Sequence, residues 1–346
     1  MSTEPPAGEA GMETPDAETT KASVRASGDR TIQQYQNWMQ INAASHLLRA
    51  ARQCGLIELL QQGQQTLEQV CDRLSLDPES AEPYLACLTS IGIVEQYGED
   101  YALARAGHLL CQYDQDLGDA RWENLGEKMQ PRQPEPDPGK LAQYRSRLAA
   151  TQWIHTSAAL QAAEILDVAN PKHAELRLLD LGCGAGVWSC AIAHQVPGST
   201  VLAVDQAELL QSAQETANSI ELGERYETLA ENPITAELPG DAFDLAVLPQ
   251  LVSCLDDQTA AGLLKSVFAA LKAGGRVAIP DLYVGPAKAG LKESLGRLEV
   301  SVCTPHGKVR DLRDCDKLLR DAGFTGIQFS YLVASEQGLG MLVAEK

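Results

Sequence analysis

The chain has 346 residues, which at about 100–200 residues per domain indicates roughly two domains. Its 28 Lys and Arg against 47 Asp and Glu give a net charge of −19, which opposes attraction to nucleic-acid phosphates or anionic lipid. No apolar run reaches the ~20 residues of a membrane-spanning helix, and the N-terminus lacks the basic and apolar segments of a signal peptide.

The nine cysteines are scattered along the sequence, with no CxxC pair and no histidine at zinc-ligand spacing from two of them. This distribution is typical of free thiols in a reducing compartment and argues against disulfides or a structural metal. Together with the acidic charge, it predicts a cytoplasmic protein without a metal site, a membrane anchor or a nucleic-acid partner.

The N-terminal third begins with residues 1–30, which are rich in Pro, Gly, Ser, Thr and Glu and nearly free of large apolar side chains. Such a segment cannot bury enough surface to offset its ordering entropy, so we expect a disordered acidic leader. From residue 31 the apolar residues follow a helical spacing, with Leu47, Leu48 and Ala51 on one face.

Two capping signals and a turn signal follow. Thr66 with Gln69 resembles a capping box, and Asp77 followed by proline predicts the N-terminus of a further helix. Residues 93–97 and 101–103 flank a Gly-Glu-Asp turn, which predicts a β-hairpin. Helices followed by a hairpin describe a winged helix.

A winged helix suggests DNA binding, but its charge opposes that function. Residues 31–113 hold four basic and nine acidic side chains, a net charge of −5 that leaves no basic face for phosphates. We therefore expect this module to bury its long N-terminal helices against a second copy of the chain.

Beyond residue 171, short apolar strands alternate with helical stretches, which indicates a parallel sheet with helices on both faces. A closing antiparallel pair is expected at residues 327–333 and 340–344. The predicted parallel strands are 177–181, 200–204, 243–248 and 276–280, and the predicted helices are 189–194, 209–220 and 259–271.

The segment after the first of these strands has the pattern of a nucleotide site. Gly182, Gly184 and Gly186 form GxGxG, whereas dinucleotide-binding proteins carry GxGxxG. Asp180 precedes this turn and suits a ligand with an ammonium group, but it would repel a pyrophosphate. Asp205 ends the next strand, 25 residues later, where a carboxylate can accept both hydroxyls of a ribose.

These motifs, after the winged-helix pattern, resemble the class I S-adenosylmethionine-dependent small-molecule O-methyltransferases of the caffeic acid, acetylserotonin and bacterial polyketide type. The resemblance runs from about Asn37 to the C-terminus. It implies a doubly wound Rossmann-like α/β sheet that binds S-adenosyl-L-methionine. It also implies an N-terminal winged-helix domain that forms a homodimer, and methylation of a small aromatic or polyketide-like acceptor, at oxygen in most members.

The resemblance also implies site residues and boundaries. Residues 230–234 resemble the family's Gly-Asp-hydrophobic segment beside adenine, with Glu231 or Asn232 in the place of the aspartate. The expected organisation is a leader at 1–30, a dimerisation domain at 31–115, a linker with pocket helices at 116–170 and the cofactor-binding domain at 171–346. The predicted cofactor-binding residues are Asp180, Gly182, Cys183, Gly184, Gly186, Asp205, Gln206, Glu231 and Asn232.

The acid–base residues depart from the family pattern. Ser253 stands where the family carries a histidine that deprotonates the acceptor, and Val309 replaces one of two glutamates that orient this base. Asp281 matches the other glutamate. An unactivated serine hydroxyl cannot replace an imidazole as a general base, which typically contributes ~10²–10⁴-fold to a rate.

Three interpretations remain open. The acceptor is acidic enough to need no strong base, another residue serves as base, or the chain binds the cofactor without methylating. The candidate catalytic residues are Asp281, His306, His155 and Ser253. Asp256 is a further candidate, but its position before a predicted helix favours a capping role.

Overall fold

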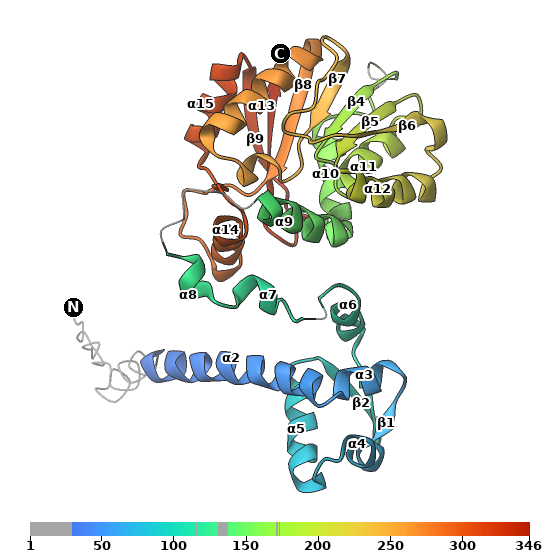
Figure 1. Ribbon diagram of the computed structural model, residues 1–346, viewed down its shortest axis with the longest axis vertical. Coiled ribbons are helices and arrows are strands. Elements are labelled where there is room, and N and C mark those ends of the chain that lie inside the picture. The colour runs from blue at the N-terminus through green and yellow to red at the C-terminus, as the bar shows by residue number, and fades with distance from the viewer. Residues whose placement is uncertain (1–29, 115, 131–137, 171, 173) are drawn as a thin grey trace, which may run out of the picture. The chain divides into compact units, whose positions relative to one another are not determined.

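The computed structural model describes residues 30–114, 116–130, 138–170, 172 and 174–346. The chain divides into two compact units, Met1–Gly118 and Asp119–Lys346 (Figure 1). Of the predicted leader, only Arg30 lies within the described residues, where it begins a helix. No helix in these described ranges is long and apolar enough to cross a membrane.

The first unit consists mainly of helices and holds a small antiparallel sheet with the strand order β1-β3-β2. The predicted hairpin is confirmed as β2 and β3. The elements are α2 (Arg30–Gln53), α3 (Leu56–Gln61), β1 (Gln65–Thr66), α4 (Leu67–Leu74), α5 (Pro78–Ser90), β2 (Val94–Tyr97), β3 (Asp100–Leu103) and α6 (Arg105–Tyr113).

Both predicted helix starts in this unit are confirmed by their caps. The Thr66 hydroxyl accepts a hydrogen bond from Gln69 N, while the Gln69 side chain accepts one from Thr66 N, which completes the capping box of α4. Asp77 caps α5 by accepting from Ser80 N. Helices α3, α4 and α5 share a core that includes the fully buried Leu85.

Helix α2 differs from the other helices of this unit because its N-terminal half exposes large apolar side chains. Five of them, within ten residues, have exposed fractions between 49% and 63%. Ala51 is the one fully buried residue of the helix. The exposed residues are Ile32, Tyr35, Trp38, Met39 and Ile41.

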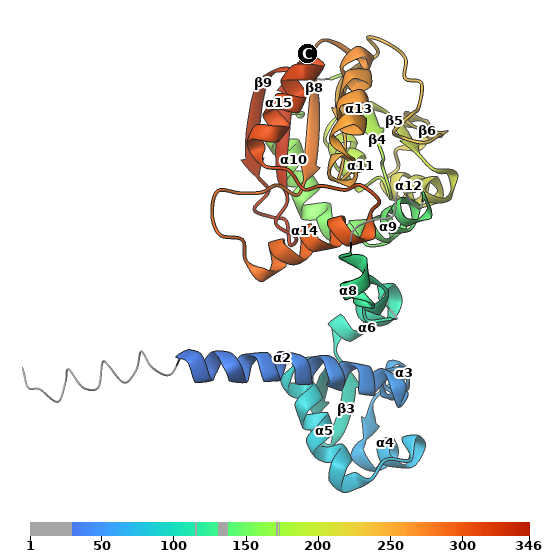
Figure 2. The ribbon, with the colours of Figure 1, turned by 60° about the vertical axis from the view of Figure 1, so that its left-hand side comes forward.

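The second unit is a seven-stranded sheet with helices on both faces (Figures 1 and 2). Its helices are α7 (Asp119–Trp122), α8 (Leu125–Lys128), α9 (Pro138–Ala150), α10 (Thr156–Ile165), α11 (Val187–Gln195), α12 (Ala207–Ser219), α13 (Asp257–Ala270), α14 (Leu291–Cys303) and α15 (Leu312–Ala322), with short 3-10 helices η1 (Gln152–His155), η3 (Gly223–Arg225) and η4 (Val252–Cys254). Its strands are β4 (Arg177–Leu181), β5 (Thr200–Asp205), β6 (Tyr226–Ala230), β7 (Phe243–Val247), β8 (Leu271–Asp281), β9 (Thr325–Tyr331) and β10 (Gly340–Glu345).

The strand order is β6-β5-β4-β7-β8-β10-β9, in which β10 pairs antiparallel with both of its neighbours. Consecutive residues of β4 face opposite sides: Leu178 packs in the core with α10, α11 and α12, and Leu179 in the core with α13 and α15. The predicted doubly wound Rossmann-like sheet and its closing antiparallel pair are therefore confirmed.

The sequence pattern missed β6, α14 and α15. Strand β6 lies at the edge of the sheet and buries only Tyr226, so its apolar pattern is weak. Helix α15 is rich in charged residues, and its N-cap Asp311 accepts from two backbone N–H groups. Within the predicted linker with pocket helices, α9 and α10 are separate helices, because η1 interrupts them after Thr151.

Candidate functional site

The chain order of the strands reverses between β4 and β7, and ligands of open parallel sheets bind at such a point, beyond the carboxyl ends of the strands. The turn after β4 lies at this edge. Gly182, Gly184 and Gly186 have φ angles of +76°, +57° and +73°, a region that L-residues with side chains rarely adopt. The glycines therefore permit a tight turn to which other groups can approach closely.

Asp205, at the end of β5, holds this turn in place. Its carboxylate accepts hydrogen bonds from Gly184 N at 2.9 Å and from Gln206 N at 2.9 Å. Arg145 of α9 completes the set with an ion pair of 2.6 Å from Nη2 to Asp205 Oδ2. The Asp205 side chain has no exposed area, and that of Arg145 has 7%.

The space over the glycine turn is filled by two long polar side chains. A Cβ atom added to Gly182 would lie 2.9 Å from Arg145 Nη2, and one added to Gly184 would lie 2.9 Å from Gln152 Nε2. Gln152 also accepts a hydrogen bond from Val187 N, at the first residue of α11. The flexible ends of Arg145 and Gln152 thus occupy the place where a ligand of this turn would lie.

Asp180 is fully buried and only partly satisfied. Its Oδ2 accepts a short hydrogen bond from the Ser189 hydroxyl, while its Oδ1 has no hydrogen-bond partner. Burial raises the pKa of Asp180 to about 7, against the hydrogen bond from Ser189, which lowers it. An unpaired buried acceptor of this kind suits an ammonium donor.

The other predicted cofactor residues lie in different environments. Cys183 belongs to the same buried core as Trp188, and burial raises the pKa of its thiol. Gln206 is half-buried before α12. Glu231 and Asn232 are both exposed after β6, and the Asn232 side chain accepts from Ile234 N.

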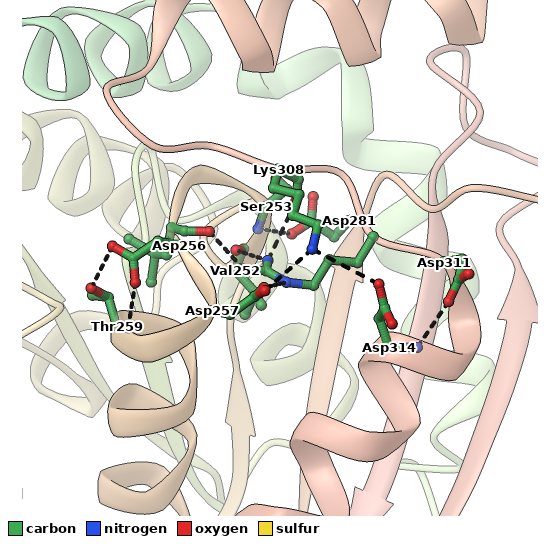
Figure 3. Close-up of polar contacts among 11 residues, drawn as sticks. Val252, Ser253, Asp256, Asp257, Thr259, Asp281, Lys308, Asp311 and Asp314 are labelled. Atoms are coloured by element: carbon green, nitrogen blue, oxygen red, sulfur yellow. Dashed lines mark hydrogen bonds and ion pairs between the residues drawn. The ribbon is translucent and has the colours of Figure 1, made fainter. Parts of the chain in front are cut away.

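Ser253 and Asp281 lie close together, and the Asp281 carboxylate accepts a hydrogen bond from the Ser253 backbone N–H. Asp281 ends β8 and accepts hydrogen bonds from Ser253 N at 2.9 Å and Leu282 N at 2.7 Å (Figure 3). Burial raises the pKa of Asp281 to about 6, while hydrogen bonds from the Ser253 side chain and from the Ser253 and Leu282 N–H groups lower it. The carboxylate is therefore used to hold η4 against the end of β8.

Arg310 braces the same segment from the other side. Its guanidinium donates to the carbonyls of Val252 at 2.9 Å and Leu255 at 2.7 Å, and its Nε pairs with Asp257 at 2.8 Å. Asp256 caps α13 through Thr259 N, as the sequence predicted (Figure 3). These contacts fix the position of Ser253, and its side chain also hydrogen-bonds the Asp281 carboxylate.

The two candidate histidines differ in burial. His306 is exposed in the loop after α14. His155 is 2% exposed, and its ring centroid lies 5.9 Å from that of Trp188. Burial lowers the pKa of His155 to about 4, with a hydrogen bond to Gln250 opposing the shift, so the imidazole is neutral at pH 7 and weakly basic.

A cavity with a volume of about 580 Å³ lies within the second unit, between α7, α9 and α14. Tyr144 and Gln250 line this cavity. The residues that follow them in sequence, Arg145 and Leu251, both lie against Gly182. The cavity therefore adjoins the glycine turn. Ser253, Asp281, His306 and His155 are not among its lining residues.

Three polar residues of the site, Arg145, Gln152 and Gln250, were not predicted from the sequence. The first two precede the glycine turn by more than 25 residues, and no motif marks them. Gln250 had a signal, because it is a polar residue just after an apolar strand. Its backbone, at φ +49°, is in the left-handed region, and its N–H donates to Pro280 O at 2.8 Å.

The comparisons with known proteins agree with this geometry. The sequence of residues 132–325 matches the family model of the O-methyltransferase domain. The chain belongs to this family. The methyltransferase is 26% identical over 263 residues to the 3-hydroxy-5-methyl-1-naphthoate 3-O-methyltransferase of Streptomyces sahachiroi, a match that covers 70% of this chain and 75% of that enzyme.

Two solved structures have the same fold as the methyltransferase. Human N-acetylserotonin methyltransferase, in complex with S-adenosylmethionine, has a TM-score of 0.68 at 18% identity, covering 92% of this chain and 98% of that chain. The mitomycin 7-O-methyltransferase MmcR has a TM-score of 0.72 at 17% identity, covering 94% and 99%.

S-adenosylmethionine is the cofactor of the methyltransferase. The site fits this group for two reasons. The Asp205 carboxylate accepts several hydrogen-bond donors, and the Asp180 carboxylate keeps an unpaired oxygen beside the glycine turn. The comparisons give no support to the alternative, a relative that binds the cofactor without methylating.

The raised pKa of Asp281 makes stability depend on pH. The folded protein keeps this proton up to about pH 6, whereas the unfolded chain loses it near the ordinary value of 3.8. The contribution of Asp281 to the free energy of unfolding therefore falls as pH rises through this window, by about 3 kcal/mol in total and about 1 kcal/mol between pH 5 and 6.

Urea unfolding of the wild type and Asp281→Asn, measured from about pH 5 to pH 8, checks this. The wild type should lose stability relative to the variant up to about pH 6, with a constant difference above that pH. Asp321→Asn, at an exposed position on α15, controls for the loss of one charge. Parallel pH profiles for the wild type and Asp281→Asn would contradict the raised pKa.

Proposed function

We propose that the methyltransferase binds S-adenosylmethionine on the turn after β4 and methylates a hydroxyl group of a small aromatic acceptor held in the adjoining cavity. The observation that supports this most is the pair of carboxylates, Asp180 and Asp205, at the ends of neighbouring strands on either side of a glycine turn. The naphthoate methyltransferase relative supports an aromatic acceptor.

Each residue of the proposed cofactor site has a distinct role. Asp205 accepts the sugar hydroxyls, for which Arg145 must release it, and the unpaired oxygen of Asp180 accepts the ammonium group. Gly182, Gly184, Gly186 and the backbone of Cys183 let the amino-acid part approach closely. Gln206 and either Glu231 or Asn232 lie at the ends of the next strands, on the nucleoside side.

When bound, S-adenosylmethionine supplies a methyl group on a positively charged sulfur, which is an activated leaving group. The acceptor oxygen gains this methyl group as the carbon–sulfur bond breaks, and the hydroxyl proton leaves to water. The protein contributes position, and holding two reactants in line accounts for much of the rate of such a step.

We propose that the acceptor hydroxyl is acidic, as in a phenol or an enol, because no strong base lines the cavity among its described residues. Asp281 is engaged by two backbone N–H groups, and His306 is exposed. His155, with a pKa of about 4, is a weak base and reaches the cavity only through Gln250. An acidic hydroxyl supplies the nucleophilic oxygen without a histidine at residue 253.

Methyl-labelled S-adenosylmethionine tests the proposed function with a set of hydroxylated naphthalenes and benzenes that differ in hydroxyl pKa. We expect labelled ethers, formed faster with the more acidic hydroxyls at neutral pH. Saturated alcohols of similar size serve as the matched negative set. Absence of labelled product from every aromatic compound would contradict the proposal.

Calorimetry with S-adenosylhomocysteine tests the two carboxylates. An ammonium group favours ionised Asp180, whose pKa is about 7 without ligand, so wild-type affinity should rise roughly eightfold from about pH 6 to pH 7.5. His155, with a pKa of about 4, does not titrate in this window. Asp180→Asn should remove the pH dependence.

Asp205→Asn should behave differently, weakening binding by roughly 10–100-fold at pH 7.5, because it loses a charged acceptor of hydroxyl donors. Since the charge of Asp205 helps to raise the pKa of Asp180, this variant should also move the pH dependence to lower pH. Thermal unfolding of both variants without ligand controls for folding. Undiminished affinity in Asp205→Asn would show that the sugar lies elsewhere.

We further propose that the first unit is a winged-helix module through which two chains form a homodimer in the cytoplasm. The exposed apolar side chains of α2 support this, since contiguous apolar surface of this kind is typical of an interface. The net charge of −5 over residues 31–113 supports a protein partner in preference to a nucleic acid.

Light scattering should give twice the 37.2 kDa chain mass at micromolar concentration. Trp38→Glu with Tyr35→Glu places two charges within the exposed apolar residues of α2 and should yield a monomer. Gln33→Glu, also exposed on α2, is the matched control and should leave the dimer intact. A wild-type monomer would contradict the proposal.

A further inference from the structure

The acceptor cavity gathers positive charge in a strongly acidic chain. Arg121, Arg147 and Lys292 line it, and Glu299 is the one acidic residue among the described residues of its lining. The whole chain carries a net charge of −19. A cavity with a local excess of positive charge raises the concentration of an anionic ligand and stabilises it.

One edge of the Arg147 guanidinium is buried without a hydrogen-bond acceptor. Its Nε and Nη2 atoms both lack a partner. These two nitrogens form the edge of the guanidinium that binds a carboxylate through two parallel hydrogen bonds. Buried donors without acceptors cost free energy, so a ligand oxygen pair that displaces the side chains covering this edge would be well bound.

Glu299 is close to this edge without satisfying it. Its Oε1 lies 3.6 Å from Arg147 Nη2 and 3.8 Å from Arg121 Nε, which are ion-pair distances longer than a hydrogen bond. One carboxylate therefore holds two guanidinium groups near each other. Glu299 carries a single negative charge against these two guanidinium groups, and the Nε–Nη2 edge of Arg147 still has no hydrogen-bond acceptor.

The remaining walls suit a flat ring system. The Arg147 guanidinium carbon lies 5.7 Å from the centre of the Tyr144 ring, which is 4% exposed and lines the cavity. Trp122, Leu148 and Leu282 also line it. Aromatic and aliphatic side chains bury the body of a ligand while a few polar groups orient it.

We infer that the acceptor is an aromatic hydroxy acid whose carboxylate binds the Nε–Nη2 edge of Arg147, with Arg121 and Lys292 adding positive charge. The inference rests on the proposed methyl transfer and narrows its acceptor to a chemical class. The same positive charge favours the phenolate form of the acceptor, which is the form that attacks the methyl group. The cluster thus binds the acceptor and compensates in part for the absent base.

Binding gives a test that requires no turnover. The probe is 3-hydroxy-1-naphthoate, titrated by its own fluorescence in the presence of S-adenosylhomocysteine, beside its neutral carboxamide. We expect the wild type to bind the acid roughly 10–100-fold more tightly than the amide, and Arg147→Gln to abolish this preference by weakening acid binding alone. Arg147→Lys, which keeps the charge but not the two-nitrogen edge, should restore only part of it.

Kinetics with labelled S-adenosylmethionine give the second readout. In Arg147→Gln, kcat/KM should fall much further for the acid than for the amide, because the amide loses only the stabilisation of its phenolate. Thermal unfolding without ligand checks that the variant folds. Arg297→Gln is the matched control, because Arg297 is exposed on α14 and does not line the cavity. It should keep the preference for the acid.

The outcomes separate the two proposals. Equal binding of acid and amide by the wild type, or equal losses for both in Arg147→Gln, would overturn the anionic acceptor. Binding of the acid that depends on Arg147, without labelled product from any aromatic hydroxyl compound, would support the anion site and contradict the proposed methyl transfer.

Discussion

The carboxylate of Asp205 is the constraint on which the rest of the site depends. It is buried at the end of β5, yet it binds the backbone of the glycine turn and the guanidinium of Arg145. A buried charge is tolerated only when several donors surround it, and removal of one partner of such a pair costs about 3–5 kcal/mol. Strand β5, the turn after β4 and helix α9 are therefore held together by one group.

Most of the sheet could be predicted from the sequence because its strands are apolar on both faces. β4 and β5 alternate between two cores, and both were placed to within one residue. The caps at Thr66 and Asp77 were equally clear, since a local hydrogen bond requires them. Elements with few buried residues gave no such signal. Helix α14 buries only Val300 and Val302, because its other face meets a cavity and solvent.

The site could be predicted only where backbone conformation dictates sequence. The glycines of the turn need positive φ, so they could be recognised in the sequence, as could the two aspartates beside them. Arg145 and Arg147 could not be found in this way. They lie on one helix and serve different places, one over Gly182 and one in the cavity, and this division appears only after α9 is packed.

Asp281 shows how a position can keep its residue type and change its use. A carboxylate that could orient a histidine instead accepts the backbone N–H of Ser253, and Arg310 binds the carbonyls on the other side of η4. The loop keeps its shape without the base. With this loop, an acidic acceptor hydroxyl can do without a general base in the protein. The range of usable acceptors is then limited to molecules with acidic hydroxyl groups.

The ion pair between Arg145 and Asp205 has a further consequence for the reaction cycle. If the sugar of the cofactor takes the place of Arg145, the guanidinium acts as an internal competitor for the same oxygen atoms. It lowers the affinity for the methyl donor and for its spent form by the same factor, since both carry the same sugar. Once the spent nucleoside dissociates, the ion pair can form again, which disfavours rebinding of the product and of a new methyl donor alike.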